Sequence, residues 1–500
     1  MASHRVALIG AGIGGLAAAA LLARNGVDVT VLERAPGPGG KMCEETVAGR
    51  RIDAGPTVFT MRWVFDELFA DLGTSLDAHL TITRADILAR HAWGPEERLD
   101  LFADPGRSAE AIGRFAGAAE ARGFRDFLAR ARRTYATLEG PFIRGARPTP
   151  VSLATSAGLS GLGDLWRISP FTTLWKALGE HFRDPRLRQL FGRYATYVGA
   201  SPFLAPATLM LVAHVEQEGV WLVEGGMHRV ATTLADLAAA SGATFRYGAE
   251  VAEITVARGR ATGLRLAGGE HIEADAVIAN TDAAAFAEGL LGGAASAAVP
   301  RPAARSLSAV TWAMVAKAEG FPLSRHTVFF SADYEAEFRH MLERGRLPAR
   351  PTVYVCAQDR DGSEATPGDR SAAPGDRERL LVLVNAPATG DSNAYPPSEV
   401  QPCETAAFAL MERCGLRLTR QEAVVTTPAQ WRRRFPGTGG ALYGAPPHGW
   451  AASFGRPGAR TALPGLYLAG GSVHPGAGVP MATLSGRQAA ASLLADLASR

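Results

Sequence analysis

Apolar and polar positions near the start of the chain fall into blocks that predict a strand, a helix and a second strand. Residues Arg5 to Ile9 form a short apolar run, which is typical of a buried strand. The run Leu16 to Arg24 is rich in alanine and leucine, as in a buried helix, and Asn25-Gly26 ends it with a turn. Residues Val27 to Leu32 predict a second strand. This order predicts a βαβ unit.

Glycines join the first strand to the helix with the spacing GxGxxG, at Gly10, Gly12 and Gly15, and Gly14 adds a fourth. Gly10 permits a tight turn, Gly12 lets a pyrophosphate approach the free N–H groups of the helix, and Gly15 lets the helix pack closely on the strand. Glu33 follows the second strand, where a carboxylate can bind an adenosine ribose. The bare spacing is weak in a glycine-rich chain, but its context predicts a dinucleotide site. A glycine turn without a ligand is the alternative.

Hydrophobic patterns later in the chain return to the same fold. Helical patterns dominate from 76 to 215, and Thr244 to Ile254 with Gly263 to Leu266 predicts a hairpin. Ala276 to Asn280 predicts a buried strand of the dinucleotide sheet, and Gly465 to Gly470 predicts another before a C-terminal helix. The fold class is therefore α/β, with a Rossmann-like N-terminal domain and a discontinuous, partly helical second domain. The first domain is expected at 1–75, 220–290 and 435–500, and the second at 76–219 and 291–434.

Composition and charge narrow the classes of function. A net charge of +3 in 500 residues gives no basic stripe, so no nucleic-acid partner is expected. The four cysteines, Cys43, Cys356, Cys403 and Cys414, form no CxxC pair, so neither a zinc site nor a redox dithiol is predicted. We also expect no signal peptide and no transmembrane helix, because glycines interrupt the first apolar run and no apolar stretch is long enough.

The residues after Glu33 favour FAD over a nicotinamide cofactor. A glycine pair and a basic residue soon after the ribose carboxylate would place more N–H groups and a positive charge near a pyrophosphate, which is typical of flavoproteins. A second glycine turn could then approach an isoalloxazine ring. The residues expected to bind FAD here are Arg34, Gly39, Gly40, Lys41, Gly55, Pro56 and Thr57.

The C-terminal part agrees with a flavin site. The strand at 465–470 runs into a glycine turn, and HPGAGVP precedes the last helix. A helix N-terminus directed at the flavin N1 and C2 carbonyl would stabilise the anion that forms when hydride arrives. The residues expected to contact FAD in this part are Gly470, Gly471, Ser472, Gly478, Val479, Pro480 and Met481.

Together, the glycine motif, Gly39-Gly40-Lys41, Asp53 to Thr57 and HPGAGVP resemble the phytoene-desaturase branch of the flavin amine-oxidase-like proteins. The residues 439–444 (GGALYG) and 448–450 (HGW) are similar to those of bacterial 1-hydroxycarotenoid 3,4-desaturases. The resemblance implies FAD, an acyclic carotenoid substrate and removal of two hydrogens from C-3 and C-4. It also implies that backbone groups near Val251 hold the adenine.

The reaction removes one hydrogen as hydride and the other as a proton, so the enzyme needs a proton acceptor. His474 is the best motif candidate, and a structural histidine that shapes its turn is the alternative interpretation. His228 and Glu224 are weaker candidates. We predict that His474→Ala keeps bound flavin and lowers turnover at least tenfold.

A membrane surface is an expected partner, because a long polyene resides in a bilayer. Trp166 and Trp175 lie among apolar and basic residues within 159–182, a pattern that suits either a membrane interface or a core helix pair. We expect a cytoplasmic protein peripherally associated with the inner or photosynthetic membrane. Quinone or oxygen is the expected electron acceptor.

Three alternatives remain open at this point. The first is another enzyme of the same branch: a phytoene desaturase, a carotenoid oxidase or an isomerase. The second is an amine oxidase, although nine tyrosines offer little support for an aromatic cage. The third is a prenyl-lipid-binding protein of the GDP-dissociation-inhibitor type, which would bind no flavin and so would not need the intact glycine set.

Overall fold

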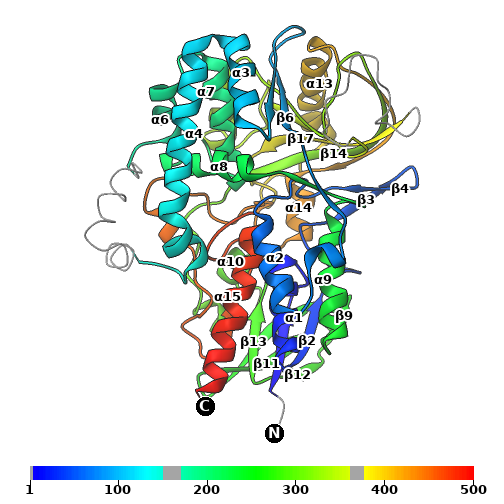
Figure 1. Ribbon diagram of the computed structural model, residues 1–500. Coiled ribbons are helices and arrows are strands. Elements are labelled where there is room, and N and C mark those ends of the chain that lie inside the picture. Colours follow the sequence, from blue (N-terminus) through cyan, green and yellow to red (C-terminus); the bar gives the residue numbers. More distant parts are fainter. Residues whose placement is uncertain (1–3, 150–170, 361–376, 500) are drawn as a thin grey trace.

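The computed structural model describes residues 4–149, 171–360 and 377–499. Its described residues form two layered halves, which Figure 1 shows one above the other, with both chain ends at the lower half. The lower half contains a parallel sheet in the order β19-β13-β1-β2-β9. Its strands are β1 (Arg5–Ile9), β2 (Asp28–Glu33), β9 (Thr244–Tyr247), β13 (Ala276–Ala279) and β19 (Leu466–Leu468).

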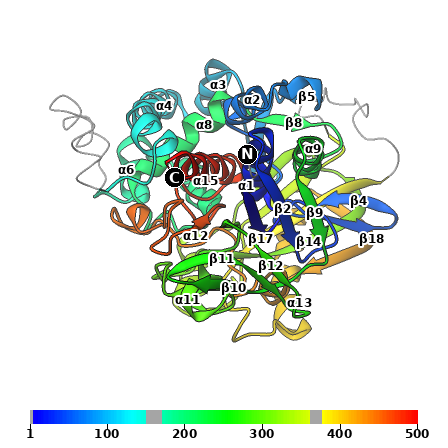
Figure 2. The same ribbon diagram turned by 90° about the horizontal axis from the view of Figure 1, so that it is seen from below.

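The parallel sheet is covered on both faces, as its alternating side chains require. Val6 and Leu8 of β1 pack into the core shared with the helices on one face, and Ala7 and Ile9 pack into the core on the other. Figure 2 shows α1 and α15 on one side of the sheet and β10 to β12 on the other. The helices on the first face are α1 (Ile13–Arg24), α2 (Arg62–Asp71), α9 (His228–Ala240) and α15 (Val479–Ala498).

The second face is covered by an antiparallel sheet of β10 (Val251–Ala257), β11 (Arg260–Leu266) and β12 (His271–Glu273). The hairpin prediction for Thr244 to Ile254 is therefore wrong in its first part. Residues Thr244–Tyr247 pair in parallel with β2, whereas the hairpin joins β10 to β11. The two strands are separated by only three residues, Gly248 to Glu250, so the sequence pattern did not show that they belong to different sheets. The short helices α10 (Ala283–Ala287) and α11 (Gly293–Ser296) lie nearby.

The upper half contains a seven-stranded sheet in the order β18-β14-β17-β16-β15-β6-β7. The strands are β6 (Ile87–Ala92), β7 (Arg98–Phe102), β14 (Ser308–Glu319), β15 (His326–Phe329), β16 (Val353–Ala357), β17 (Glu378–Ala386) and β18 (Arg417–Thr426). Two of them lie in the block that the sequence suggested was mainly helical. The chain outside these strands adds α12 (Tyr334–Leu342), α13 (Pro397–Arg413) and α14 (Pro428–Arg434), and the hairpin of β3 (Glu44–Val47) and β4 (Arg50–Asp53).

A helical group packs beside this sheet, at the upper left of Figure 1. It consists of α3 (Pro105–Ala116), α4 (Ala118–Leu138), α6 (Leu174–His181), α7 (Pro185–Gly192) and α8 (Leu211–Glu218), with single turns at Glu139–Arg144, Arg193–Val198 and Ala207–Met210. β5 (Ile82–Arg84) pairs with β8 (Trp221–Val223) at its edge. Within the segment 159–182, residues 159–170, including Trp166, lie outside the described residues. Leu174 and Leu178 are fully buried in the helical core.

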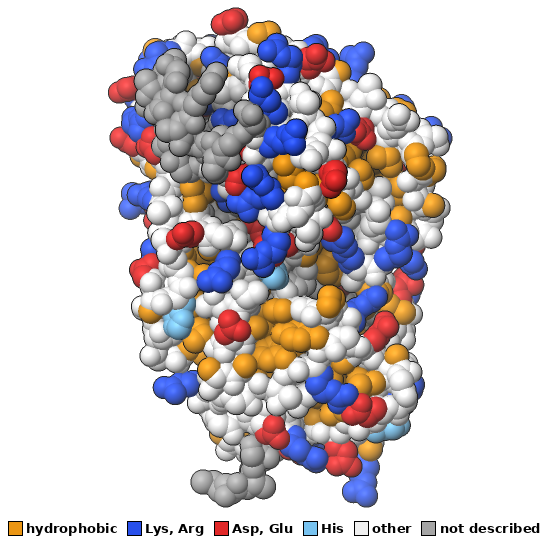
Figure 3. Space-filling view, turned by 90° about the vertical axis from the view of Figure 1, so that its right-hand side faces the viewer, with side chains coloured by type: hydrophobic (Ala, Val, Ile, Leu, Met, Phe, Trp, Pro, Cys, Tyr) orange, Lys and Arg blue, Asp and Glu red, His pale blue; other side chains and the backbone are white. Residues whose placement is uncertain are grey.

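The α/β fold class, with its Rossmann-like sheet, is confirmed. The helix after the glycine turn begins at Ile13 rather than Leu16, so Gly14 and Gly15 lie in its first turn. Of the helices in the described part of the chain, none is long and apolar enough to span a bilayer. Figure 3 shows one flank of the molecule, where positive and negative side chains are interspersed and hydrophobic side chains gather around a central hollow.

Candidate active site

One continuous cavity of about 2020 Å³ joins the two halves. Its lower region is formed by loops at the carboxyl ends of the parallel strands, and we call this region the cradle. Its inner wall is formed by α8, the turn 193–198 and the seven-stranded sheet. Its mouth is lined by aromatic side chains, including Phe171, Trp450 and Phe454. Ligands of open α/β sheets bind at the carboxyl ends of the strands, so the cradle is the expected cofactor region.

The glycine turn forms the floor of the cradle. Gly10 has a φ of +92°, and its N–H donates to the Leu32 carbonyl at 2.8 Å. A side chain at Gly15 would begin 2.3 Å from the Gly10 carbonyl oxygen, so only glycine allows α1 to pack this closely on the strand. No side chain caps the N-terminus of α1, which faces the cavity at Gly12, Ile13 and Gly14. Free N–H groups and the helix dipole therefore favour an anion here.

Glu33 is fixed in place before any ligand binds. Its two carboxylate oxygens accept hydrogen bonds from the backbone N–H groups of Ala11 and Ala35, each at 2.7 Å. The side chain is buried and lines the cavity. Arg34 lines the same region and pairs with Glu250 at 3.8 Å, beside Val251, which also lines the cavity. The structure thus brings the ribose candidate and the adenine candidate to one end of the cradle.

The glycine pair lies directly against the glycine turn. Gly39 forms a bridge with Gly12, and its N–H donates to the Ala11 carbonyl at 2.8 Å. Lys41 differs from the expectation that its charge would serve a pyrophosphate. Its Nζ donates to the Leu442 carbonyl at 2.7 Å and lies 3.8 Å from the Asp282 carboxylate. Burial lowers the pKa of Lys41, and Asp282 opposes that effect.

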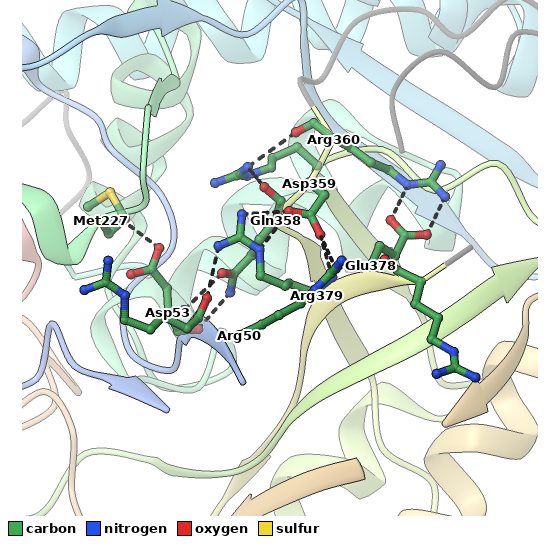
Figure 4. A network of polar contacts seen from close by, with 11 residues as sticks. Arg50, Asp53, Met227, Gln358, Asp359, Arg360, Glu378 and Arg379 are labelled. Atoms are coloured by element: carbon green, nitrogen blue, oxygen red, sulfur yellow. Dashed lines mark hydrogen bonds and ion pairs between the residues drawn. The ribbon is translucent and has the colours of Figure 1, made fainter. Parts of the chain in front are cut away.

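The second glycine turn, Gly55 to Thr57, is anchored through Asp53. The Asp53 carboxylate accepts hydrogen bonds from the N–H groups of Met227 and His228, at 2.7 and 3.1 Å, and burial raises the pKa of this carboxyl group. Its backbone N–H and carbonyl bond the side-chain amide of Gln358, which comes from the upper half (Figure 4). Gly55, Pro56 and Thr57 line the cavity.

The C-terminal motif closes the cradle. The Gly470 N–H donates to Ser485 Oγ at 3.2 Å, and Ser472 Oγ accepts a hydrogen bond from the Ala283 N–H at 2.9 Å. The N-terminus of α15 faces the cavity through a set of residues that was expected to bind FAD: Gly478, Val479, Pro480 and Met481. Gly470, Gly471 and Ser472 line the cavity as well.

His474, unlike its neighbours in the C-terminal motif, does not face the cavity. It does not belong to the described residues that line the cavity, whereas the adjoining Pro475 does. Its ring packs edge-on against Phe142, and its Nε2 lies 3.1 Å from the Gly145 carbonyl oxygen. Burial lowers the pKa of His474 to about 4. This geometry favours the structural interpretation of His474 over the catalytic one.

His228 is also held by its neighbours. Its Nδ1 lies 3.4 Å from the Glu44 carboxylate, and its Nε2 lies 3.0 Å from the Pro38 carbonyl oxygen. The hydrogen bond to Glu44 raises the pKa of His228 despite burial. Both ring nitrogens therefore have partners within the cradle wall.

Sequence reasoning missed three polar residues of the cradle: Asn280, Asp282 and Arg456. Asn280 donates to the Gly10 carbonyl at 3.3 Å, and Arg456 donates to the carbonyls of Gly471, Tyr443 and Ala445. Asn280 and Asp282 directly follow the buried strand Ala276–Ala279, so polar residues at the end of a parallel strand were a usable signal. Arg456 lies in a loop that gives no such signal.

The cradle fits FAD by the chemistry of its donors. It offers an uncapped helix N-terminus for a pyrophosphate, a preoriented carboxylate for a ribose and a second helix N-terminus in the same cavity. Glu33, Gly39 and Gly40 would hold the adenosine and pyrophosphate parts, and residues 470–472 and 478–481 would face the flavin part.

Comparison with known sequences agrees with this site. Residues 13–494 match the family model for flavin containing amine oxidoreductases. The chain is 56% identical over 503 residues to a hydroxyneurosporene desaturase of Rubrivivax gelatinosus, covering 99% of this chain and 94% of that protein. It is 45% identical over 500 residues to a hydroxyneurosporene desaturase of Cereibacter sphaeroides, covering 99% and 98%.

Comparison with solved structures supports the fold. Wild-type putrescine oxidase bound to putrescine is 16% identical and superposes with a TM-score of 0.62, covering 99% of both chains. At that identity the likeness concerns the fold alone. Family and fold together make FAD the cofactor and redox catalysis the activity. The chain belongs to the flavin containing amine oxidoreductase family, within a branch that it shares with hydroxyneurosporene desaturases.

Proposed function

We propose that this chain is an FAD-dependent carotenoid desaturase that introduces the C-3,4 double bond into acyclic carotenoids with a hydroxyl group at C-1. The observation that carries the proposal is the single cavity, in which the dinucleotide cradle continues into an apolar wall. Leu211, Val212 and Val215 of α8 line that wall. The resemblance to two hydroxyneurosporene desaturases over the full chain supports the substrate class.

The apolar wall of the cavity orients the carotenoid substrate. Bound FAD supplies the oxidation by accepting a hydride. The apolar side chains Leu211, Val212 and Val215 of α8 hold a polyene in one orientation and exclude water from it. Lys41, Asp282 and Arg456 also line the cavity, and Lys41 and Asp282 lie 3.8 Å apart there.

The experiment is a turnover assay of flavin-loaded protein in liposomes. 1-Hydroxyneurosporene and phytoene are offered in parallel, and products are resolved by chromatography with absorbance detection. We expect a red-shifted product from the hydroxylated substrate and none from phytoene. Conversion of phytoene alone would make the protein a phytoene desaturase instead. A Gly15→Val variant, which cannot keep α1 on its strand, serves as a control without flavin.

We also propose that the protein docks peripherally on a membrane through the cavity mouth. Phe171, Leu204 and Trp450 are 61%, 47% and 45% exposed, which is unusual for large apolar side chains. The rings of Phe171 and Trp450 lie 5.4 Å apart, and both line the cavity. Leu204 adjoins them, because its carbonyl accepts the Gly449 N–H. A polyene could therefore pass from a bilayer into the cavity without crossing water.

Co-sedimentation with liposomes tests the docking. The triple variant Phe171→Ser, Leu204→Ser, Trp450→Ser should lose at least nine tenths of the bound fraction and keep its flavin. Leu342→Ser, at a leucine on α12 that is 39% exposed and does not line the cavity, is the control and should bind as the wild type does. If the triple variant bound liposomes as well as the wild type does, the cavity mouth would not be the docking surface.

A docked enzyme has access to quinone in the membrane. Turnover is therefore compared under argon with added quinone and in air, to identify the electron acceptor.

A further inference from the structure

A buried arginine in the inner wall has almost no hydrogen-bond partner. Arg193 is 7% exposed, lines the cavity, and donates one hydrogen bond, from Nη2 to the Tyr197 hydroxyl at 2.9 Å. Its Nε is buried and has no partner among the described residues. A guanidinium carries five N–H donors, and buried donors are nearly always paired. The wall therefore contains a charged group whose donors are not all paired within the described part of the protein.

The charge of Arg193 is compensated without using up its donors. Glu216 of α8 is 3% exposed and also lines the cavity. Its carboxylate accepts the Tyr197 hydroxyl at 2.9 Å and the Tyr194 hydroxyl on its other oxygen. Tyr197 thus links the cation to the anion. A purely structural network would satisfy its members fully, whereas this one leaves the arginine short of acceptors.

Arg193 lines the same cavity as the glycine turn that is expected at the flavin end. The charge of Arg193 lowers the pKa of Tyr354, although burial raises it more strongly. The Tyr354 hydroxyl lies 2.7 Å from Thr57 Oγ1, and Thr57 belongs to the glycine turn expected beside the isoalloxazine ring. Arg193, Tyr354 and Thr57 all line this one cavity.

Substrate chemistry requires a polar group at this place. The oxygen on C-1 is three bonds from C-3 and four from C-4, so it lies roughly 4–5 Å from the carbons that lose hydrogen. Its partner must therefore stand beside the flavin end of the cavity and not at the far end of a tunnel. An apolar pocket discriminates poorly on an added hydroxyl, whereas a buried donor that needs an acceptor discriminates well.

We infer that Arg193, held by Tyr197 and Glu216, binds the C-1 hydroxyl oxygen and sets the preference for hydroxylated carotenoids. This inference rests on the proposed function. Arg193 donates from its unpaired N–H groups to the hydroxyl oxygen, so a methoxyl oxygen at C-1 also accepts. A carotenoid with hydrogen at C-1 leaves the donors unpaired in a dry cavity.

The test compares kcat/KM for 1-hydroxyneurosporene with that for its deoxy analogue, 1,2-dihydroneurosporene. We expect the wild type to prefer the hydroxylated substrate at least tenfold. In Arg193→Met the preference should fall at least tenfold, through loss of activity on the hydroxylated substrate and not on the analogue. Arg193→Lys should recover part of the preference. The 1-methoxy substrate should follow the hydroxylated one in each variant.

Controls separate specificity from folding. Arg188→Met removes another arginine, which has a buried Nε without a partner among the described residues and lies outside the cavity lining, and this variant should keep the wild-type preference. If Arg193→Met binds no flavin, Tyr197→Phe, which removes only the hydroxyl that holds Arg193, should lower the preference at least threefold. An unchanged preference in a flavin-loaded Arg193→Met or Tyr197→Phe protein would overturn the inference. A wild type that converts both substrates equally would also overturn the inference, whereas one that converts neither would overturn the proposed function instead.

Discussion

At the scale of single residues, Glu33 shows how the cradle is organised around its ligand. Two backbone N–H groups orient its carboxylate, so Glu33→Ala removes both a ligand contact and the support of the turn. We expect flavin affinity to fall by about 10- to 100-fold, which corresponds to the roughly 1.5–3 kcal/mol of a charged hydrogen bond. Equilibrium dialysis of flavin measures this. Glu273→Ala, whose side chain is 80% exposed, should leave the affinity unchanged.

The buried histidines make stability depend on pH. Burial lowers the pKa of His326 to about 3 and that of His474 to about 4, whereas an unfolded histidine titrates near 6.5. Below pH 6.5 these two histidines are therefore protonated in the unfolded chain but remain neutral in the folded chain. The free energy of unfolding falls as the pH drops from 7 towards 4, by roughly 2 kcal/mol for each such histidine at pH 5.

Urea unfolding of His474→Gln at pH 7.5 and pH 5 checks this contribution. The variant should lose roughly 2 kcal/mol less than the wild type between the two pH values. The control is His271→Gln, at an exposed histidine, which should leave the change in unfolding free energy between the two pH values the same as in the wild type.

The same His474→Gln variant also tests whether His474 is the proton acceptor. Turnover at pH 7.5 within threefold of the wild type would agree with its place outside the cavity, and a tenfold loss with flavin retained would support the catalytic prediction.

At the scale of elements, the crossing of α1 and α15 fixes the cradle floor. A side chain at Gly486 would begin 2.0 Å from the Gly14 carbonyl oxygen, so the two helices meet backbone to backbone. We expect Gly486→Val to lower the free energy of unfolding by about 3 kcal/mol and to release flavin, because α15 must move off α1. Thermal unfolding and flavin absorbance measure both effects.

Gly113 is a helix glycine at which we expect the opposite effect of a substitution on the free energy of unfolding. In α3, a side chain at Gly113 would meet its nearest neighbour at 3.6 Å, an ordinary contact. Gly113→Ala should therefore raise the free energy of unfolding by up to about 1 kcal/mol through helix propensity. If Gly113→Ala destabilised the protein as much as Gly486→Val, the loss at Gly486 could not be attributed to the crossing of α1 and α15.

The elements that local pattern could predict are those of the cradle. The strand, glycine turn and helix at 5–24, the strand at 276–279 and the last helix all have periodic apolar residues and glycine punctuation. The seven-stranded sheet was not predicted, because β6 and β15 pair across more than 200 residues and no local signal announces such pairing. Lys41 was predicted to serve a pyrophosphate, and its pairing with Asp282 could not be predicted because it depends on tertiary packing.

At the scale of the whole molecule, the two halves are tied together at Asp53. The Gln358 amide bonds both the N–H and the carbonyl of Asp53, at 3.0 and 2.8 Å (Figure 4). Gln358→Leu would leave two buried backbone groups unpaired, so we expect the free energy of unfolding to fall by about 2–5 kcal/mol. Urea unfolding measures the loss. Gln421→Leu, at an exposed glutamine of β18, should change it by less than about 0.5 kcal/mol.

The continuity of the cavity makes the cofactor and the substrate two ligands of one space. Each would form part of the wall that encloses the other, so we expect their affinities to be linked, with the same factor in both directions. Flavin should therefore leave the protein at least threefold more slowly from liposomes that contain the hydroxylated carotenoid than from liposomes without it. Equal release rates would contradict this prediction. An enzyme built in this way retains its cofactor best where its substrate is abundant.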